Sequence, residues 1–425
     1  MAYSDCNVLV IGYGQSGKAV VKKALELNKN AYVYDKISGF LSEEEAKEPI
    51  KNKEVSLSVI SPGVPYDCAL SVFSRENGVD VVSELEYGAS FLNRPIAAIT
   101  GTNGKTTTVT LLDKMIKESG KRSVLCGNVG FPVTSASGIK SDFAVLECSS
   151  FQLEGIKDFK PKIAAILNVS PDHIDRHKSF ENYFAIKSKI TENQDESDFL
   201  VLNKNLDGKI KTRAKTYCFS ATEKTNGAHL EKDNIVFGNG EYVTGLYNVR
   251  LLGKHNVENV LAAVTMAKLL KISNVYIERA VSTFYGVPHR IAFVREIDGV
   301  KYYNDSKGTN IASALVAADA MEGNTVLIIG GKDKGISYDA LFEALPKKVT
   351  AAVVFGENAE SILLSAEKFG FRNVKRCKTL KECVLTARYL AKDGNVLLSP
   401  ATSSFDMFAD FEERGERFEE IVRSL

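Results

Sequence analysis

Short runs of valine, isoleucine, leucine and alanine recur along the chain and alternate with longer stretches of helical periodicity. The clearest runs are NVLVIG, AYVYD, IAAIT, FAVLE, IAAILN, TVLIIGG, AAVVFG and NVLLSP. Strands that are apolar almost throughout are buried on both faces, which is typical of parallel sheets covered by helices on either side. The pattern therefore predicts an α/β fold built from parallel sheets.

The overall composition excludes several classes of partner. The chain carries 54 basic and 53 acidic residues, so it has no net field to attract nucleic acid or anionic lipid. The first residues, MAYSDCNVLVIG, lack a basic region, and their apolar run is too short for a signal sequence or a membrane span. The 7 cysteines are odd in number and show no CxxC spacing, as expected of reduced thiols. We therefore expect a cytoplasmic protein that binds neither nucleic acid nor membrane.

A glycine-rich turn follows the first apolar run. It reads Gly12-Tyr-Gly14-Gln-Ser-Gly17, and Asp35 ends the next strand, where an acid that binds ribose lies in dinucleotide folds. A second loop suited to phosphate, SPGVP, begins at Ser61, again after an apolar run. These features predict a bound nucleotide, as in a dehydrogenase. The alternative is that the glycines only allow a helix to pack against a strand.

A second glycine turn, in ITGTNGKTTT, is more specific. Gly101, Gly104, Lys105 and Thr106 supply what a phosphate loop needs: backbone N–H groups that surround phosphate oxygens, a lysine for the terminal phosphates and a hydroxyl for magnesium. The loop is shorter than the usual GxxxxGK[ST]. A lysine that follows glycine by chance is the alternative, but the strand before it and the helical stretch TTVTLLDKMIKESG after it favour the phosphate site.

These motifs also set the domain boundaries, since no linker rich in proline or glycine separates the parts. We place a Rossmann-like domain at residues 1–92 and a P-loop ATPase-like parallel-sheet domain at 93–286. A second Rossmann-like domain follows at 287–425, where PHRIAFV begins a new strand pattern.

Two further strand ends carry polar residues that suit a magnesium nucleotide. FAVLE ends in Glu147, and IAAILNVSPDH continues from its strand through Asn168 and Asp172 to His173. Open parallel sheets present their ligands at these ends, so we favour His173 as a metal ligand over a solvated loop histidine. His177 and His229 have no such context and are left unassigned.

A lysine lies within an apolar helical stripe in SFENYFAIKSKITEN. Phe180, Tyr183, Phe184 and Ile190 share one face, and Lys187 lies in its middle. A buried ammonium is costly, so its pKa should fall, and the free amine can add carbon dioxide to give a carbamate that binds magnesium. The alternative is a lysine that extends off the edge of the stripe to solvent. Spacing alone leaves both open.

The motifs GTNGKTTT, LECSSFQLE, NVSPDHIDRH, AIKSKI, LLGKHNVENVLAA, PHR, YYNDSKGTN and IIGGKDKG occur in an order that resembles the Mur ligases. These are ATP-dependent amide-forming enzymes of peptidoglycan precursor synthesis. The amino-terminal GYGQSG and SPGVP and the final LLSPATSSFDMFADFEERG are similar to those of members that add D-glutamate. The resemblance implies the small-molecule substrates UDP-N-acetylmuramoyl-L-alanine and D-glutamate, ATP, two magnesium ions, a carbamate on Lys187 and a monomer.

The resemblance also implies roles for individual residues. The expected catalytic residues are Lys105, Asn128, Glu147, His173 and Lys187, and the expected metal ligands are Thr106, Glu147, His173 and Lys187. The expected ATP-binding residues are Gly101, Thr102, Asn103, Gly104, Lys105, Thr106, Thr107, Asn256, Asn259, Arg290 and Asp305. The UDP substrate is expected at Gly14, Gln15, Ser16, Asp35, Ser61, Pro62, Gly63 and Asn128. Without the resemblance, Asp305 could equally cap a turn and Arg290 could be a surface charge.

D-glutamate has two carboxylates, so its pocket should contain cations and a helix amino terminus. The expected residues are Lys307, Thr309, Lys334, Ser404, Phe405 and Phe411. Ser404 is predicted to begin the helix SFDMFADFEERG, with Phe411 inside it. The chain departs from the family pattern in reading GGKDKG where GGDGK is frequent, and in having Phe405 where an aliphatic residue is common.

Other functions explain less of the chain. A nicotinamide dehydrogenase leaves GTNGKTTT without a role, and a folate polyglutamate ligase lacks the leading UDP domain. Sister ligases for L-alanine, a diamino acid or a dipeptide would share the ATP residues, but the DNPR-like motif of the diamino-acid enzymes is absent from the sequence. A nucleotide-binding switch would bind ATP without turnover that depends on an amino acid.

Overall fold

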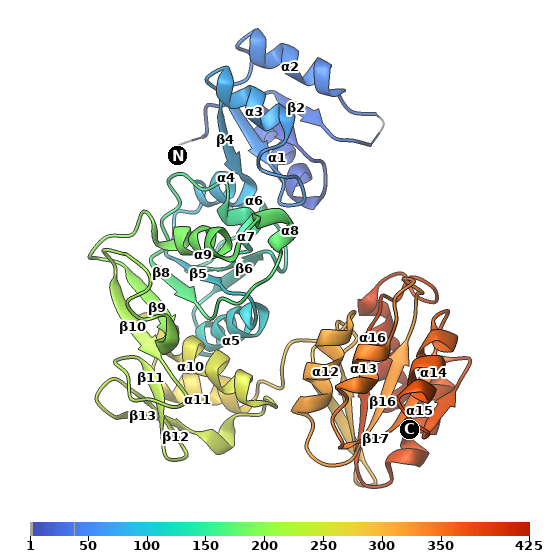
Figure 1. Ribbon diagram of the computed structural model, residues 1–425. Coiled ribbons are helices and arrows are strands. Elements are labelled where there is room, and N and C mark those ends of the chain that lie inside the picture. Colours follow the sequence, from blue (N-terminus) through green and yellow to red (C-terminus); the bar gives the residue numbers. More distant parts are fainter. Residues whose placement is uncertain (1–2, 38) are drawn as a thin grey trace. The chain divides into compact units, whose positions relative to one another are not determined.

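A computed structural model describes residues 3–37 and 39–425 of the protein (Figure 1). Contacts within the chain divide it into two compact units. One comprises 1–249 with 257–283, and the other comprises 250–256 with 284–425. In the described residues, the first unit holds three sheets and the second holds one.

The first sheet of the first unit has the order β2-β1-β3-β4, and all its strands are parallel. Its strands are β1 (Val8–Ile11), β2 (Ala31–Tyr34), β3 (Leu57–Ile60) and β4 (Asp80–Ser83). Its helices are α1 (Gln15–Glu26), α2 (Glu43–Lys51), α3 (Ala69–Glu76) and α4 (Glu84–Ala89). Val8 and Val10 pack on one face with α1 and α4, whereas Leu9 and Ile11 pack on the other with α2 and α3. Both faces are therefore buried, as the apolar runs predict.

The central sheet has the order β10-β9-β8-β5-β7-β6 and is also parallel throughout. Its strands are β5 (Ile96–Thr100), β6 (Ser123–Gly127), β7 (Phe143–Glu147), β8 (Ile163–Ile166), β9 (Phe199–Asn203) and β10 (Lys215–Phe219). Its helices are α5 (Lys105–Glu118), α6 (Val133–Ala136), α7 (Ser150–Leu153), α8 (Ile174–His177), α9 (Phe180–Ser188), α10 (Lys254–Leu269) and α11 (Asn274–Ser282). In Figure 1, α5 lies on one side of this sheet and α7 and α9 lie on the other. Strand β5 has β7 on one side and β8 on the other, so their carboxyl ends form the ligand-binding crevice expected of such a sheet.

A small antiparallel sheet follows the central one and was not predicted. It consists of β11 (Ala228–Glu231), β12 (Asn234–Phe237) and β13 (Glu241–Gly245). The turn between β11 and β12 has a φ of 55° at Lys232, and the next turn contains Gly238 and Gly240, both with positive φ. The expectation of parallel sheets is therefore wrong here, because short turns of this kind join antiparallel neighbours.

The second unit contains one sheet of order β14-β15-β19-β16-β17-β18. Its strands are β14 (Ala292–Ile297), β15 (Val300–Asn304), β16 (Thr325–Gly330), β17 (Val349–Phe355), β18 (Val374–Arg376) and β19 (Asn395–Leu398). Its helices are α12 (Ile311–Ala320), α13 (Asp339–Glu343), α14 (Ala359–Lys368), α15 (Leu380–Ala391) and α16 (Phe411–Arg423). Helices α12, α13 and α14 cover one face, and α15 and α16 cover the other.

The edge strand β14 is antiparallel to β15, so this sheet is mixed rather than wholly parallel. The two strands are joined by Asp298 and Gly299, whose φ values are 49° and 81°. An Asp-Gly pair with positive φ at both positions makes a tight hairpin, and a hairpin can only join antiparallel strands. All the apolar runs named in the sequence analysis form parallel strands. None of the described helices is long and apolar enough to cross a bilayer.

Candidate functional site

The loop between β5 and α5 has the shape that a phosphate site requires. Gly101 and Gly104 have φ values of 153° and 83°, and a Cβ at Gly104 would lie 2.1 Å from Asn259 Oδ1. Helix α5 begins at Lys105 with no side chain capping its amino terminus and no acid in its first turn. Its first N–H groups therefore remain available to an anion. Lys105 Nζ donates to the carbonyl oxygens of Gly101 and Thr102, each at 2.8 Å.

The segment after β8 holds this loop in place. Asn168 Oδ1 accepts from Asn103 N at 2.9 Å, and Asn168 Nδ2 donates to Asn103 O at 3.1 Å. Thr102 N donates to Asn168 O at 3.0 Å, and Thr102 Oγ1 lies 3.1 Å from the Tyr183 hydroxyl. The sequence places Asn168 at a strand end, but its pairing with the phosphate loop depends on how β5 and β8 align.

Lys187 is buried beneath the same loop. Its side chain donates to Gly101 O at 2.9 Å and to Thr100 Oγ1 at 3.4 Å, and the residue is only 1% exposed. The alternative of a lysine that extends to solvent is therefore wrong. Burial, with a smaller contribution from Lys105, lowers the pKa of Lys187 to about 7. A substantial fraction of the amine is neutral near neutral pH, which is the form that reacts with carbon dioxide.

Glu147, at the end of β7, combines burial with an unpaired oxygen. The residue is 2% exposed, and Oε1 accepts from Asn128 Nδ2 at 2.7 Å. Among the described residues, Oε2 has no hydrogen-bond partner. A buried carboxylate oxygen without a partner is costly unless a cation binds there, so the site fits a metal ion.

The groups near Glu147 are compatible with magnesium. No three His, Cys, Asp or Glu side chains form a metal cluster anywhere in residues 3–37 and 39–425. Magnesium suits such a site, since it is usually held by one or two carboxylates together with substrate phosphates and water. Thr106, the first hydroxyl after Lys105, is 7% exposed at the start of α5.

His173 precedes α8 with a φ of 51°, and its side chain is 50% exposed. Its Nε2 lies 3.6 Å from Asp172 Oδ2, and its ring lies 4.9 Å from that of Phe151. The histidine is thus held at the crevice on the β8 side. The buried His177, which was left unassigned, lies between Ser150 and Glu154.

The first glycine turn is the second candidate site of this unit. A Cβ at Gly17 would lie 2.1 Å from Gly12 O, so α1 packs closely on β1, whereas no described heavy atom lies within 4 Å of a Cβ at Gly14. The helix begins with no side-chain cap, so Gln15 and Ser16 present backbone N–H groups.

Asp35 and Ser61 both reach this turn. Asp35 accepts from Tyr13 N at 2.6 Å and from Ile37 N at 3.0 Å. The bond from Tyr13, and then that from Ile37, lowers the pKa of Asp35. Ser61 Oγ donates to Gly12 O at 2.7 Å. The SPGVP loop, which contains Pro62 and Gly63, is thereby brought to the glycine turn.

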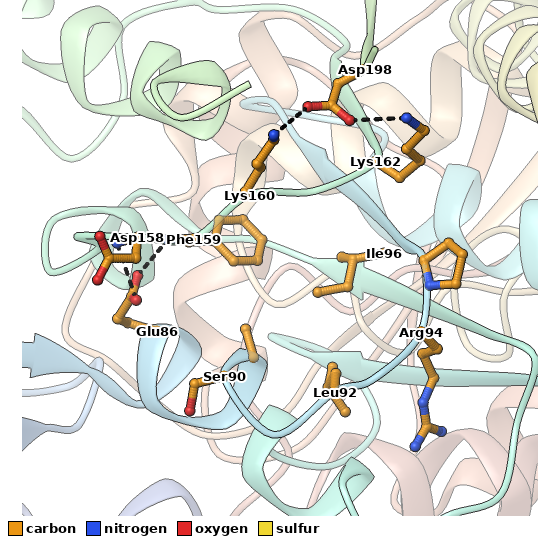
Figure 2. Close-up of a pocket in the computed structure, with 12 residues that line it drawn as sticks. Glu86, Ser90, Leu92, Arg94, Ile96, Asp158, Phe159, Lys160, Lys162 and Asp198 are labelled. Atoms are coloured by element: carbon orange, nitrogen blue, oxygen red, sulfur yellow. Dashed lines mark hydrogen bonds and ion pairs between the residues drawn. The ribbon is translucent and has the colours of Figure 1, made fainter. Parts of the chain in front are cut away.

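Figure 2 shows a different hollow, of about 430 Å³, at the opposite edge of the central sheet. Its lining includes the residues that precede β5, β8 and β9 rather than those that follow them. Lys160 and Lys162 lie 3.4 and 3.2 Å from Asp198, and Glu86 accepts from the backbone of Asp158 and Phe159. The two lysines are thus paired with Asp198, and backbone N–H groups satisfy Glu86. Ligands of parallel sheets bind at the carboxyl ends of the strands, so we do not assign this hollow to the reaction.

The second unit contains three of the residues predicted to bind ATP, namely Asn256, Arg290 and Asp305. Asp305 is 4% exposed, with Oδ2 accepting from Ser399 Oγ at 2.6 Å and Oδ1 accepting from Ile291 N at 3.2 Å. Burial raises the pKa of Asp305 to about 7. Arg290 is exposed, and Asn256 Nδ2 donates to Leu252 O at 2.6 Å. The Asp305 side chain therefore accepts hydrogen bonds from Ser399 and Ile291, outside its own turn, so it is not a simple turn cap.

The residues predicted for D-glutamate form two pairs in the same unit. Lys307 Nζ lies 5.3 Å from the centre of the Phe411 ring, and Lys334 Nζ donates to Thr309 O at 3.1 Å. Ser404 is 1% exposed, whereas Phe405 is 69% exposed. A cation over an aromatic face and a second lysine nearby suit an amino acid with two carboxylates.

The predicted start of the last helix is wrong. Helix α16 begins at Phe411, where Asp410 caps it by accepting from Glu413 N at 2.8 Å. The residues after Ser404 form a turn instead, in which Met407 N and Phe408 N both donate to Ser404 O. Asp410 with two acids in the first turn is the stronger start signal, and Ser404 therefore precedes the helix.

Arg414, on α16, was not predicted. It is fully buried and donates to Ser306 Oγ at 2.9 Å, Ser306 O at 2.8 Å and Thr402 O at 3.2 Å. Burial lowers its pKa to about 10. The guanidinium thus joins the loop that carries Lys307 to the loop that carries Ser404. An arginine among the charged residues EERGER gives no sequence signal of burial.

Comparisons with family profiles and with solved structures show which proteins the chain is similar to. The profile of the Mur ligase middle domain matches residues 99–267, and that of the Mur ligase glutamate ligase domain matches residues 289–401. A solved UDP-N-acetylmuramate–alanine ligase from Thermotoga maritima aligns with a TM-score of 0.61 at 19% identity, with 99% of each chain covered. That likeness shows the fold.

Curated relatives are similar along their full lengths. UDP-N-acetylmuramoylalanine–D-glutamate ligase from Thermoanaerobacter sp. (strain X514) is 42% identical, with 98% of each chain covered. The protein of that name from Caldanaerobacter subterraneus subsp. tengcongensis is 38% identical over 100% of both chains. With its phosphate loop, acid-tipped strands and both domain profiles in place, the chain belongs to the Mur ligase family.

Proposed function

We propose that the protein joins D-glutamate to UDP-N-acetylmuramoyl-L-alanine at the expense of ATP. The observation that carries the proposal is the identity of 42% across 98% of both chains with a ligase named for this reaction. ATP phosphorylates the free carboxylate of the UDP substrate, and the amine of D-glutamate attacks the acyl phosphate. ADP is the leaving group of the phosphorylation. The tetrahedral intermediate then loses a proton from the amine and expels phosphate, which leaves the amide. The product is a peptidoglycan precursor, and we place the enzyme in the cytoplasm as a monomer.

The phosphate loop is assigned to ATP. Lys105 and the N–H groups at the start of α5 would hold the terminal phosphates, and Thr106 and Glu147 would hold a first magnesium ion. His173 and a carbamate on Lys187 would hold a second. Magnesium, when bound, offsets the negative charge that phosphates and carboxylates bring together. Support comes from the unpaired Glu147 Oε2 and from the buried Lys187 amine. Further ATP contacts are assigned to Thr102, Asn103, Thr107, Asn256, Asn259, Arg290 and Asp305.

The other two substrates are assigned to separate places. The UDP part would bind at the first glycine turn, through Gly14, Gln15, Ser16, Asp35 and the loop Ser61–Gly63. Asn128 would contact the reacting end, since its amide already pairs with Glu147 at 2.7 Å. D-glutamate would bind through Lys307, Thr309, Lys334, Ser404, Phe405 and Phe411. This division corresponds to three domains at 1–92, 93–286 and 287–425.

The test of the proposed function is phosphate release from ATP in the presence of UDP-N-acetylmuramoyl-L-alanine. D-glutamate, L-glutamate, L-lysine, diaminopimelate and no amino acid are compared. We expect turnover with D-glutamate alone. Lys307 and Lys334 suit two carboxylates and disfavour the second amine of L-lysine or diaminopimelate, and the relative named for D-glutamate supports that enantiomer over L-glutamate. Turnover with another acceptor would overturn the assignment of the amino-acid pocket. If no acceptor supports turnover, the proposed reaction itself is overturned.

Two alanine substitutions in the first glycine turn should separate ligand binding from folding. Gly17→Ala should lower the free energy of unfolding by about 1–3 kcal/mol, because its methyl group would overlap Gly12 O. Gly14→Ala should leave stability unchanged, since Gly14 has a φ of −71° and open space around it. It should nevertheless weaken binding of the UDP substrate, because the backbone there must approach the diphosphate closely.

Denaturant unfolding and calorimetric titration with UDP-N-acetylmuramoyl-L-alanine measure the two effects on the same samples. Normal binding by Gly14→Ala would show that the diphosphate does not lie against this turn.

A further inference from the structure

A partly buried polar network joins the SPGVP loop of the first sheet to the segment that follows β8 of the central sheet. The Arg176 side chain, on α8, donates to Pro62 O and to Val64 O, each at 3.1 Å. It also donates to Glu154 Oε2 at 2.7 Å, and its guanidinium carbon lies 4.1 Å from the centre of the Phe151 ring. One planar fork therefore contacts two carbonyl oxygens, a carboxylate and an aromatic face.

The network continues from Glu154 into the central sheet. His177 Nε2 lies within hydrogen-bond distance of Ser150 Oγ, at 3.0 Å. His177 Nδ1 lies 3.2 Å from Glu154 Oε1, but the described residues give this nitrogen no hydrogen bond, so the two groups are in contact only. The order serine, histidine, carboxylate resembles a nucleophilic triad. However, Ser150 and His177 are only 3% and 1% exposed, so no substrate reaches the hydroxyl. Burial lowers the pKa of His177, which keeps the imidazole neutral near neutral pH. The arrangement is a brace rather than a catalytic group.

The two ends of this brace belong to different parts of the proposed substrate site. On one side, the SPGVP loop is held to the first glycine turn by the bond from Ser61 Oγ to Gly12 O at 2.7 Å. On the other, α8 directly follows His173, and α7, which carries Ser150, begins three residues after Glu147. The brace thus links the loop assigned to UDP to both strand ends assigned to the reaction.

We infer that Arg176 is a positioning residue that sets the spacing between the bound UDP group and the reacting carboxylate of the same substrate. The inference rests on the proposed function. A substrate held at one end on one sheet and activated at the other end on a second sheet reacts only if the two sheets keep their spacing. A misplacement of about 1 Å can lower a rate about 100-fold. Lysine retains the charge at this position but cannot make the planar set of contacts.

The test compares Arg176→Lys with the unmodified enzyme in two measurements. We expect kcat/KM for UDP-N-acetylmuramoyl-L-alanine to fall about 10- to 100-fold. The KM for ATP and the calorimetric Kd of UDP alone should stay unchanged, because UDP fills only the site on the first sheet, where Ser61 holds the loop independently. Arg122→Lys is the matched control, since Arg122 makes an exposed pair with Asp142 at 2.8 Å and should change neither measurement.

A second variant covers the case in which Arg176→Lys does not fold. Glu154→Gln leaves the arginine in place but removes its charged partner, and it should lower kcat/KM in the same direction with the Kd of UDP kept. Unchanged kcat/KM in the variants would overturn the inference alone. So would a parallel loss of UDP affinity, which would make the arginine a support of the loop only. An unmodified enzyme with no turnover on D-glutamate would instead overturn the proposed function, and the inference with it.

Discussion

Lys187→Ala is expected to lower kcat by about 100- to 1000-fold, the range seen when a group that stabilises developing charge is removed. The lysine is 1% exposed, and its pKa of about 7 leaves much of the amine free to add carbon dioxide, with loss of a proton, to form a carbamate. Removal of the side chain deletes the anionic oxygens proposed for the second magnesium ion. Initial rates of phosphate release measure the loss, and circular dichroism checks the fold.

Short-chain carboxylic acids should restore part of this activity, because a small carboxylate fits the space left by the lysine and supplies similar oxygens. Lys162→Ala is the matched control, since Lys162 lies before β8, at the opposite edge of the sheet, and pairs with Asp198 at 3.2 Å. It should be active and insensitive to the acids. Loss of activity in Lys187→Ala without any rescue would count against the carbamate and leave the lysine as a simple cation.

Glu147→Gln should separate function from stability even more clearly. We expect kcat to fall about 100- to 1000-fold, because the neutral amide lacks the charge of the carboxylate and places an NH2 group where the free Oε2 would bind magnesium. The free energy of unfolding should stay unchanged or rise by about 1 kcal/mol, since an amide costs less to bury than an unpaired carboxylate oxygen. Asn128 can still donate to the retained carbonyl oxygen, so the local hydrogen bond persists.

Phosphate release across a magnesium titration and denaturant unfolding measure these two quantities. Asp142→Asn is the control from the other end of the same strand, where Asp142 forms only a surface pair with Arg122. It should leave the rate unchanged. A Glu147→Gln enzyme that is fully active, or one that loses stability and activity together, would show that Glu147 has a structural role and no metal.

The positions of candidate site residues at the ends of apolar strands could be predicted from the sequence, because the pattern that specifies each strand is local and also shows where it ends. Gly101, Lys105 and Glu147 all follow this rule. The helical stripe around Lys187 is equally local, but it left open whether the lysine is buried or extends to solvent, and only the structure shows the burial. Exceptions arose where turn chemistry was overlooked, as with Asp298 and Gly299, whose hairpin makes β14 antiparallel.

Arg176 and Arg414 could not have been found in this way. Each is an arginine in a charged stretch, and its structural role depends on a hydrogen bond to a carbonyl oxygen far away in the sequence. The acceptor is Pro62 O for Arg176 and Ser306 O for Arg414. No periodicity encodes such a contact. The start of α16 was misplaced for a different reason, because Ser404 and Asp410 are both plausible caps and only the acids after Asp410 distinguish them.

The bracing of the phosphate loop by Asn168 has a consequence for how the protein acquires its nucleotide site during synthesis. Asn103 and Asn168 are 65 residues apart, and β8 must pair with β5 before their two hydrogen bonds can form. At about 5–20 residues per second, the ribosome synthesises Asn168 several seconds after it synthesises the phosphate loop. A nascent chain that ends before β8 therefore contains the whole of GTNGKTTT and still has no finished loop to offer to ATP.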